Sequence, residues 1–171
     1  KFGDSSYQPE NFRIGSDVPS SYEINDGFYN ALELELSHDD SELYVSCSNS
    51  MEVRVFDTEN GDSLNTIMTG MMPWHIQLSK DDSELFVSNR MGSSVTVVNL
   101  ISGNINTLTD DSMSILHGCA LSANDDLLLV TSPGSGNAYV FDIENKTLTV
   151  VVKVSTGHLE IVIMDLKNGI L

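Results

Sequence analysis

The sequence predicts an all-β fold made of one four-stranded unit that recurs about every 42 residues. Two motifs show the recurrence. The first reads LSHDDSELYVS at residues 36–46, LSKDDSELFVS at 78–88 and LSANDDLLLVT at 121–131. The second reads VRVFD at 53–57, VTVVN at 95–99 and AYVFD at 138–142. Both motifs advance by 42 and then by 43 residues, as from Ser37 to Ser79 to Ser122, so chance similarity does not explain them.

Each unit divides into four short strands separated by turn signals. A short apolar stretch ends at Leu-Ser, and the Asp-Asp-Ser cluster after it is typical of a tight turn, because Asp and Ser cap their own backbone. The second strand is the β-branched and aromatic Leu-Tyr-Val-Ser segment, and the third alternates up to Asp57, Asn99 or Asp142. A second turn precedes a more polar fourth strand, expected at about 63–68, 104–108 and 147–152.

Four antiparallel strands in about 40–45 residues are typical of a β-propeller blade. The first strand of a unit carries small and apolar residues and the last carries more Thr, Asn and Ser. This gradient fits a blade, in which the first strand lines the crowded channel and the last faces solvent. We therefore predict a β-propeller of four-stranded antiparallel blades, with blades at 29–70, 71–112 and 113–156.

The two ends of the chain do not complete a blade. Residues 1–28 are interpreted as an N-terminal arm or the remnant of a preceding blade, and 157–171 as a partial blade. Asp165 ends a third-strand motif only 23 residues after Asp142. We favour a missing inner pair of strands over an inner strand at 157–164 that mimics the motif. Because propellers close with about four to eight blades, we expect part of a larger ring, or a ring completed by oligomerisation.

The charge of the chain limits its partners. Eight Lys and Arg face 25 Asp and Glu, which gives a formal net charge of −17. Such a surface repels phosphate backbones and anionic lipid, so we expect no nucleic acid. It fits a soluble protein kept apart by self-repulsion, a salty habitat or a cationic partner. No apolar run reaches the roughly 18–20 residues of a membrane span, so we expect no direct membrane insertion. The chain begins at Lys1 without a leader-like segment, which indicates a removed leader or a piece of a longer protein.

The repeat resembles the bacterial and archaeal YVTN-type β-propeller family, which includes surface-layer proteins. LYVS at 43–46 and LFVSN at 85–89 are similar to the Leu-Tyr-Val-Thr-Asn strand of that family, and VRVFD at 53–57 to its Val-x-Val-Ile-Asp strand. TIMTGMMPWHI at 66–76 is similar to its Gly-x-x-Pro passage into the inner strand, and LSAND at 121–125 to its Leu-Ser-Pro-Asp-Gly turn. The resemblance covers roughly residues 30–157. It implies a seven-bladed ring in a periplasmic or cell-surface binding protein.

The resemblance leaves the activity open. Relatives with similar blades include lactonases and haem- or quinone-dependent enzymes, and a fold alone does not choose among them. The chain also departs from the family pattern. Asp40 and Asp82 stand where the family has a turn glycine, and Ile115-Leu116 precede His117 where a proline is expected.

Five residues near the expected channel mouth are candidate ligand or partner contacts: Trp74, His75, Asn89, Arg90 and His117. Trp74 is expected to be a recognition aromatic or to pack between blades. Arg90, which follows Asn89 at the end of a second strand, is expected to hold an anionic ligand or to pair with carboxylates. His75 and His117 begin inner strands, where they hold a metal or haem edge or hydrogen-bond the blade connections. Their registers differ, since they precede their Leu-Ser serines by four and five residues.

Other residues have simpler interpretations. The Asp-Asp pairs at 39–40, 81–82 and 125–126 indicate hairpin turns, because a calcium-binding EF-hand loop needs a longer acidic spacing closed by Glu. Cys47 and Cys119 fall on different strands two blades apart, so we expect two buried thiols. Gly-x-Ser-x-Gly, phosphate-loop, CxxC and His-Glu-x-x-His motifs do not occur in the sequence. We therefore predict no catalytic residue and no cofactor.

Two classes of function follow from these features. The first is a non-enzymatic binding or scaffold protein of the cell envelope, which engages a protein or glycan through loops on one propeller face as a subunit of an envelope complex. The alternative is a propeller enzyme or electron-transfer domain with a His-lined metal or haem site at the channel mouth, or a lactonase-like hydrolase.

Overall fold

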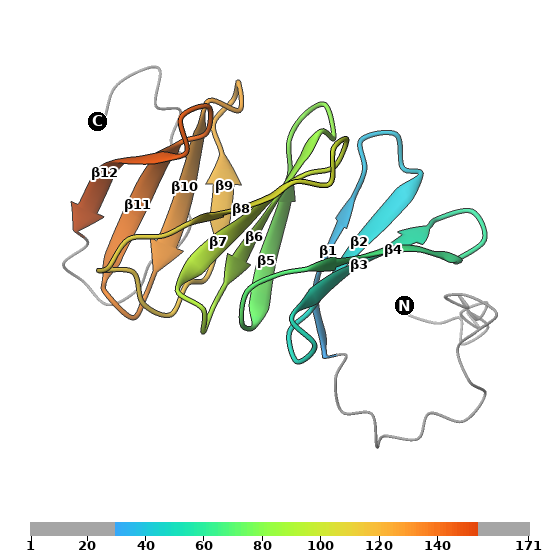
Figure 1. Ribbon diagram of the computed structural model, residues 1–171, viewed down its shortest axis with the longest axis horizontal. Helices are drawn as coiled ribbons and strands as arrows, with labels where there is room; N and C mark the ends of the chain where they lie inside the picture. The colour runs from blue at the N-terminus through green and yellow to red at the C-terminus, as the bar shows by residue number, and fades with distance from the viewer. Residues whose placement is uncertain (1–29, 154–171) are drawn as a thin grey trace, which may run out of the picture.

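The computed structural model describes residues 30–153, and every regular element in this part of the chain is a β-strand (Figure 1). The first sheet contains β1 (Ala31–Leu36), β2 (Glu42–Cys47), β3 (Glu52–Asp57) and β4 (Ser63–Met68). The second contains β5 (Pro73–Leu78), β6 (Glu84–Asn89), β7 (Ser94–Asn99) and β8 (Ile105–Leu108). The third contains β9 (Cys119–Leu121), β10 (Leu127–Ser132), β11 (Asn137–Asp142) and β12 (Thr147–Lys153). Neighbouring strands of each sheet pair antiparallel in chain order, which confirms the predicted all-β class.

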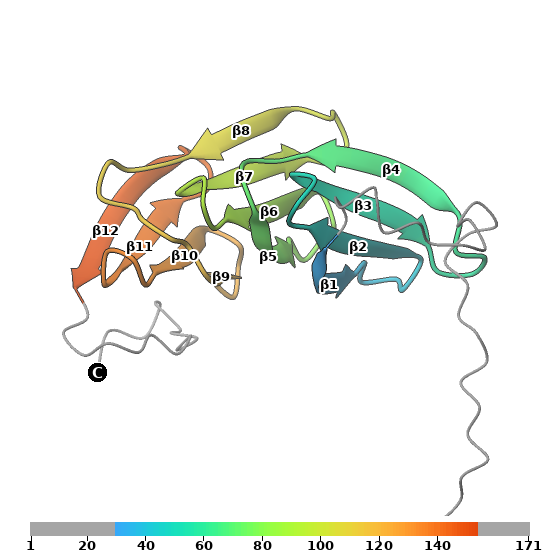
Figure 2. The same ribbon diagram turned by 90° about the horizontal axis from the view of Figure 1, so that it is seen from below.

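The three sheets are successive blades around an axis. Figure 2 shows β1, β5 and β9 on the inner side of an arc and β4, β8 and β12 on its outer side. The inner strand β5 contacts both β1 and β9. The three alternating motifs lie in β3, β7 and β11, one in each sheet, and not in one continuous sheet. The predicted order, with the first strand of each unit inside and the last outside, is therefore confirmed.

A layer of apolar side chains lies between each pair of neighbouring sheets. The layer between the first and second sheets consists of Tyr44, Val53, Val55, Ile67, Ile76, Leu78, Leu85, Val87 and Val98. The layer between the second and third includes Phe86, Val95, Val97, Leu108, Cys119, Leu128, Val130, Tyr139 and Phe141. Alternate residues of a strand point to opposite faces, so Val87 packs toward the first sheet and Phe86 toward the third. The middle sheet is thus covered on both faces.

The loops gather at two opposite ends of the blades. The turn rim joins first to second and third to fourth strands, and consists of residues 37–41, 58–62, 79–83, 100–104, 122–126 and 143–146. The Trp rim, named after Trp74 at the start of β5, consists of residues 48–51, 69–72, 90–93, 109–118 and 133–136. Because the strands of a blade alternate in direction, each rim collects loops from every blade.

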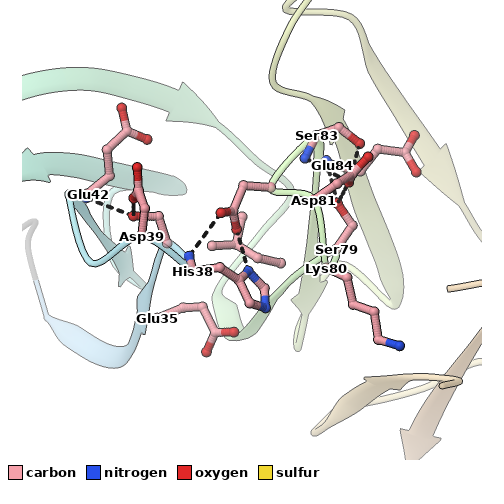
Figure 3. A network of polar contacts seen from close by, with 12 residues as sticks. Glu35, His38, Asp39, Glu42, Ser79, Lys80, Asp81, Ser83 and Glu84 are labelled. Atoms are coloured by element: carbon pink, nitrogen blue, oxygen red, sulfur yellow. Dashed lines mark hydrogen bonds and ion pairs between the residues drawn. The ribbon is translucent and has the colours of Figure 1, made fainter. Parts of the chain in front are cut away.

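The Asp-Asp pairs of the turn rim form tight turns, as predicted. Asp39 Oδ1 accepts hydrogen bonds from the hydroxyls of Ser41 (2.7 Å) and Ser37 (2.8 Å) and from the Ser41 N–H (3.0 Å). These donors, with the Ser41 hydroxyl foremost, lower the pKa of Asp39 to about 2. The next residue, Asp40, has a positive φ of 61°, which Asp tolerates better than most residues. Asp81 repeats the cap in the second blade, with Ser79 and Ser83 as its donors (Figure 3).

Asp82 and Asp125, the residues with positive φ in the second and third turns, also join neighbouring blades. The backbone N–H of His38 donates to Asp82 Oδ2 (2.9 Å), and the His38 ring lies 2.7 Å from Asp82 Oδ1 (Figure 3). In the next pair of blades, the N–H of Lys80 donates to Asp125 Oδ2 (2.8 Å). A carboxylate at this position therefore does what the family-type glycine cannot, because it accepts a backbone hydrogen bond from the preceding blade.

The third turn is shifted by one residue from the predicted alignment of Asp-Asp pairs. Asn124 occupies the place of the capping Asp and accepts a hydrogen bond from the Ser122 hydroxyl (3.3 Å). Asp125 is the residue with positive φ (57°), so it corresponds to Asp40 and Asp82. The pair at 125–126 thus lies in a hairpin turn, but Asp125, its first residue, is equivalent to Asp40 and Asp82, which are the second residues of their pairs.

Both cysteines are free and buried, at 3% exposure for Cys47 and 2% for Cys119, which confirms the prediction of two buried thiols. Within residues 30–153 there is no helix long and apolar enough to cross a membrane. The N-terminal arm predicted at 1–28 and the partial blade predicted at 157–171 lie outside the described residues.

Candidate functional site

All five candidate residues come from the end of the blades at the Trp rim. Trp74 and His75 begin the inner strand β5. Asn89 ends β6, and Arg90 follows it in the loop to β7. His117 lies just before the inner strand β9 of the next blade. The structure therefore brings together residues that are separated by up to 43 positions in the sequence.

Three of these residues form a stack. The Arg90 guanidinium carbon lies 4.3 Å from the centroid of the Trp74 ring, which is a cation–π contact. The His117 ring lies 5.6 Å from the Trp74 ring, tilted by 41°. Trp74 and Arg90 are half-buried, and His117 is exposed. The stack thus presents an aromatic ring, a cation and an imidazole together at the rim.

The backbone on either side holds this stack in place. The N–H of Arg90 donates to the carbonyl of Met72 (2.8 Å), and its carbonyl accepts from the N–H of Leu116 (3.1 Å). The Ser88 hydroxyl donates to the carbonyl of His117 (2.8 Å). Three loops from two blades are therefore fixed against one another, so little rearrangement is needed for a partner to bind.

The guanidinium of Arg90 is not paired with a carboxylate of the described residues. Among residues 30–153 no carboxylate lies within ion-pair distance of it. Arg54, the other arginine in this range, pairs with Glu52 at 2.8 Å. An arginine that is held on a tryptophan and has no carboxylate beside it within residues 30–153 suits an anionic group.

His75 has different neighbours from His117. Its Nδ1 lies 3.5 Å from Cys119 Sγ, and its Nε2 lies 4.0 Å from Glu33 Oε1 on the inner strand of the first blade. Burial lowers the pKa of His75 and raises the pKa of the Cys119 thiol to about 12. The thiol is therefore neutral at physiological pH and a poor nucleophile. His75 therefore lies between Glu33 of the first blade and Cys119 of the third.

Asn89 lies beneath the rim and not on its surface. It is fully buried, and its Nδ2 donates to Thr96 Oγ1 (2.9 Å) and Ser94 Oγ (3.1 Å). Its Oδ1 has no partner among the described residues. The backbone of Gly70 packs closely on the Asn89 side chain, which a Cβ at this glycine would approach to 2.6 Å. Asn89 therefore supports the loop that carries Arg90 and does not itself reach a ligand at the surface.

Exposed apolar side chains lie in loops of the same rim as the stack, and the sequence did not single them out. Met71 and Met91 are each 56% exposed, Met51 is 42% exposed and Ile115 is 39% exposed. Gly92, next to Met91, donates its N–H to the carbonyl of Met71 (3.0 Å), so these loops are adjacent. Their exposure depends on the packing of the loops. Met71 alone carried a signal in the sequence, because it lies close to Trp74 in the chain.

His75 and His117 do not belong to a larger set of metal ligands in the described part of the chain. No group of three or more His, Cys, Asp or Glu side chains suited to a metal ion occurs between residues 30 and 153. The metal or haem alternative therefore remains a prediction from the sequence.

Comparison with solved structures supports the propeller fold. The chain is similar to hydrazine synthase of Kuenenia stuttgartiensis, with a TM-score of 0.70 and 17% identity over 81% of this chain and 39% of that chain. It is also similar to the structure of U3-55K and to the WD40 repeats of RRP9, each with a TM-score of 0.66 and 16% identity over 73% of this chain. No family model and no curated protein matches the sequence.

At these identities the likeness shows the fold alone. The chain is an array of β-propeller blades, and it spans 39% of the length of each of these solved structures.

Proposed function

We propose that this chain belongs to a non-enzymatic propeller that binds a protein partner of the cell envelope through the Trp rim. The observation that carries the proposal is the Arg90 guanidinium, which stacks on Trp74 and faces no carboxylate among residues 30–153. Tryptophan and arginine are the residues most enriched where binding energy concentrates in protein interfaces. The stack is therefore the expected centre of the contact.

The side chains around the stack favour a protein over a glycan. Met51, Met71, Met91 and Ile115 provide exposed apolar area without the polar groups that hydrogen-bond sugar hydroxyls. Methionines are flexible and polarisable, and they adapt to the apolar side chains of a partner. Exposed apolar area of this kind, next to an aromatic anchor, is typical of protein interaction sites. We therefore expect one partner carboxylate at Arg90, with apolar partner side chains around it.

The net charge bears on how the partner approaches. A surface with a formal charge of −17 attracts a basic protein and raises its association rate at low salt. The partner is then basic overall and brings one acidic side chain to the stack. Placement in the periplasm or at the cell surface is supported by the resemblance to YVTN-type propellers alone, and cell fractionation with antibody detection tests it.

Affinity capture from the native envelope tests the proposed function. We expect that Trp74→Ala and Arg90→Ala each reduce recovery of the partner at least about tenfold, because each removes one half of the central stack. Asp62→Ala and Glu144→Ala change exposed residues of the opposite rim and serve as matched controls with unchanged recovery. Equal loss with the control variants, or unchanged capture with both stack variants, would overturn the proposal.

Glycan binding is a second outcome of the same experiment. Binding of the purified chain to isolated envelope polysaccharide, lost in Trp74→Ala, would replace the protein partner with a glycan.

A further inference from the structure

The turn between β11 and β12 contains a motif that no other part of the chain has. It reads Asn145-Lys146-Thr147, and Asn145 is the only one of 14 asparagines that is followed two positions later by Ser or Thr. Asparagine in such a motif, with any residue except proline in the middle, is the acceptor of N-linked glycans in secreted proteins. Because the motif is short, its surroundings in the fold decide whether it is usable.

The first and last residues of the motif are exposed on the turn rim. Asn145 and Thr147 are both exposed. The equivalent residues of the second blade, Ser102 and Asn104, are exposed as well, although that blade is covered on both faces. Exposure at this turn is therefore a property of the repeat and does not depend on where the described residues end. A bulky, hydrated group at Asn145 extends into solvent.

The hydrogen bonds of the turn leave the reacting groups of the motif available. Asn145 Nδ2 donates to Asp142 Oδ1 (3.0 Å), and the backbone N–H of Asn145 donates to the same oxygen (2.7 Å). A primary amide nitrogen carries two hydrogens, so the contact with Asp142 occupies one and leaves the other. The Thr147 hydroxyl makes no hydrogen bond within residues 30–153, so an enzyme that recognises it has access.

The middle residue of the motif turns away from the asparagine. Lys146 has a positive φ of 53°, at the position where the first and second blades have Gly61 and Gly103. Its Nζ lies 3.6 Å from Glu84 Oε1 of the second blade. The lysine side chain therefore packs back on the neighbouring blade and does not cover the amide of Asn145.

We infer that Asn145 is the acceptor of an N-linked glycan, transferred from a lipid-linked oligosaccharide whose anomeric carbon is joined to a diphosphate. In the transfer, Asn145 Nδ2 forms a bond to the anomeric carbon, and the bond from this carbon to the diphosphate oxygen breaks. The lipid diphosphate leaves with the electron pair, and Nδ2 gives one proton to a base of the transferase. The inference rests on the envelope placement in the proposed function, because secreted proteins are the ones that receive such glycans.

The glycan and the proposed partner occupy opposite rims. Asn145 lies on the turn rim, whereas Trp74 and Arg90 lie at the Trp rim. A glycan at Asn145 therefore leaves the proposed partner site open. We expect Asn145→Gln to recover the partner as well as the native chain does, so that the glycan and the partner site are tested separately.

Mass spectrometry of the protein purified from the envelope of its own cells tests the inference. We expect most copies of the peptide that contains Asn145 to carry an added mass made of sugar residues. Asn145→Gln and Thr147→Val, produced in the same cells, are expected to lose this mass, whereas Thr147→Ser keeps the hydroxyl and the glycan. Asn104→Gln changes an exposed asparagine of the same rim that is outside the motif, and it serves as the matched control. Circular dichroism checks that every variant is folded.

The possible outcomes separate the glycan from the proposed function. An unmodified Asn145 peptide in protein from the envelope overturns the inference and leaves the partner site at the Trp rim standing. A glycan that is retained in Thr147→Val, or lost in Asn104→Gln, is attached by another rule and overturns the inference as well. Recovery of the chain from the cytoplasm alone overturns the envelope placement, and the inference with it.

Discussion

The turn rim and the Trp rim differ in which residues they place at backbone positions with positive φ. Residues with positive φ at the turn rim are Asp40, Gly61, Asp82, Gly103, Asp125 and Lys146. Those at the Trp rim are Met51, Met72, Ser93, Ile115 and Gly136. Aspartate and glycine adopt this conformation at little cost, whereas a β-branched residue there is an outlier. Each poorly suited residue costs about 1–2 kcal/mol.

This difference shows which rim is built for stability. The Asp residues of the turn rim form tight turns, and two of them also bond the preceding blade. The Trp rim instead keeps exposed apolar side chains, such as Met51 and Ile115, at strained positions. Strain of this kind is concentrated at functional surfaces, where the surrounding structure supports it. The contrast therefore supports the proposed partner site at the Trp rim.

The largest expected effect is a loss of stability when a glycine of either rim is replaced by alanine. At the Trp rim, a Cβ on Gly134 would lie 2.5 Å from the backbone oxygen of Ser114, so Gly134→Ala is expected to lower the free energy of unfolding by about 2–3 kcal/mol. At the turn rim, Gly103 has φ +73° and nothing within 4 Å of an added methyl group, so Gly103→Ala costs only its backbone strain, about 1–2 kcal/mol. Urea unfolding measures both values. A larger loss for Gly103→Ala would contradict the tighter packing of the Trp rim.

The strain at the Trp rim is tested by removing it. Ile115 has φ 51°, and Ile115→Asn places a residue that tolerates this conformation at the same point. We expect the variant to be more stable by about 0.5–1 kcal/mol, because the relief of strain exceeds the loss of a partly exposed apolar contact. Asp40→Asn, at φ 61° on the turn rim, is the control and is expected to change stability by less than about 0.5 kcal/mol. A destabilised Ile115→Asn would show that packing of this side chain outweighs its strain.

The contact between His38 and Asp82 makes the stability of the turn rim depend on pH. The hydrogen bond and charge of Asp82 raise the pKa of His38 above its ordinary 6.5. The contact therefore stabilises the fold fully below pH 6.5, and this contribution is lost as the pH rises through the folded-state pKa. We expect the urea midpoint of the native chain to fall over this window relative to that of His38→Gln. If the urea midpoints of the native chain and of His38→Gln changed with pH in the same way, the contact would not contribute to this pH dependence.

The smallest expected effect is a local charge difference at the Trp rim. Trp74 is the only tryptophan of the chain, and its fluorescence reports on the rim alone. Because Arg90 lies over the ring, iodide is expected to quench Trp74 more strongly than caesium, despite the net charge of −17. Arg90→Gln is expected to reverse this order, and Lys80→Gln at the turn rim to leave it unchanged. Stronger quenching by caesium in the native chain would place the cation elsewhere.

Much of the fold was predictable because its signals are local. The 42- and 43-residue steps of the two motifs located β2 and β3 and their equivalents in every blade. The fourth strand expected at 63–68 is β4. Alternation and turn chemistry depend on neighbouring residues, so a sequence carries them directly. The sequence placed His75 and His117 at the start of inner strands, whereas the contact of Trp74 with Arg90 and His117 is seen only in the structure.

Other features depend on contacts between distant residues and were not predictable in detail. The Asp residues at positions 40 and 82 were seen only as departures from a family glycine, whereas Asp82 accepts a hydrogen bond from the preceding blade. Asn89 was a candidate contact, but it is buried beneath the rim. The exposure of Met71 and Met91 is set by how the loops of two blades meet.

The sequence by itself determined the blade: its four strands, its turns and the apolar residues that face its neighbours, because these follow from periods of two residues and from local turn chemistry. Only the tertiary structure decided which surfaces remain available. The stacking of one blade on the next buries Ile76 and leaves its counterpart Leu34 open, although both belong to the same repeat. The pairing of β5 with β6 sets Arg90 on Trp74, and the segment that enters the third blade brings His117 to the same ring, so the stack forms only in the folded chain.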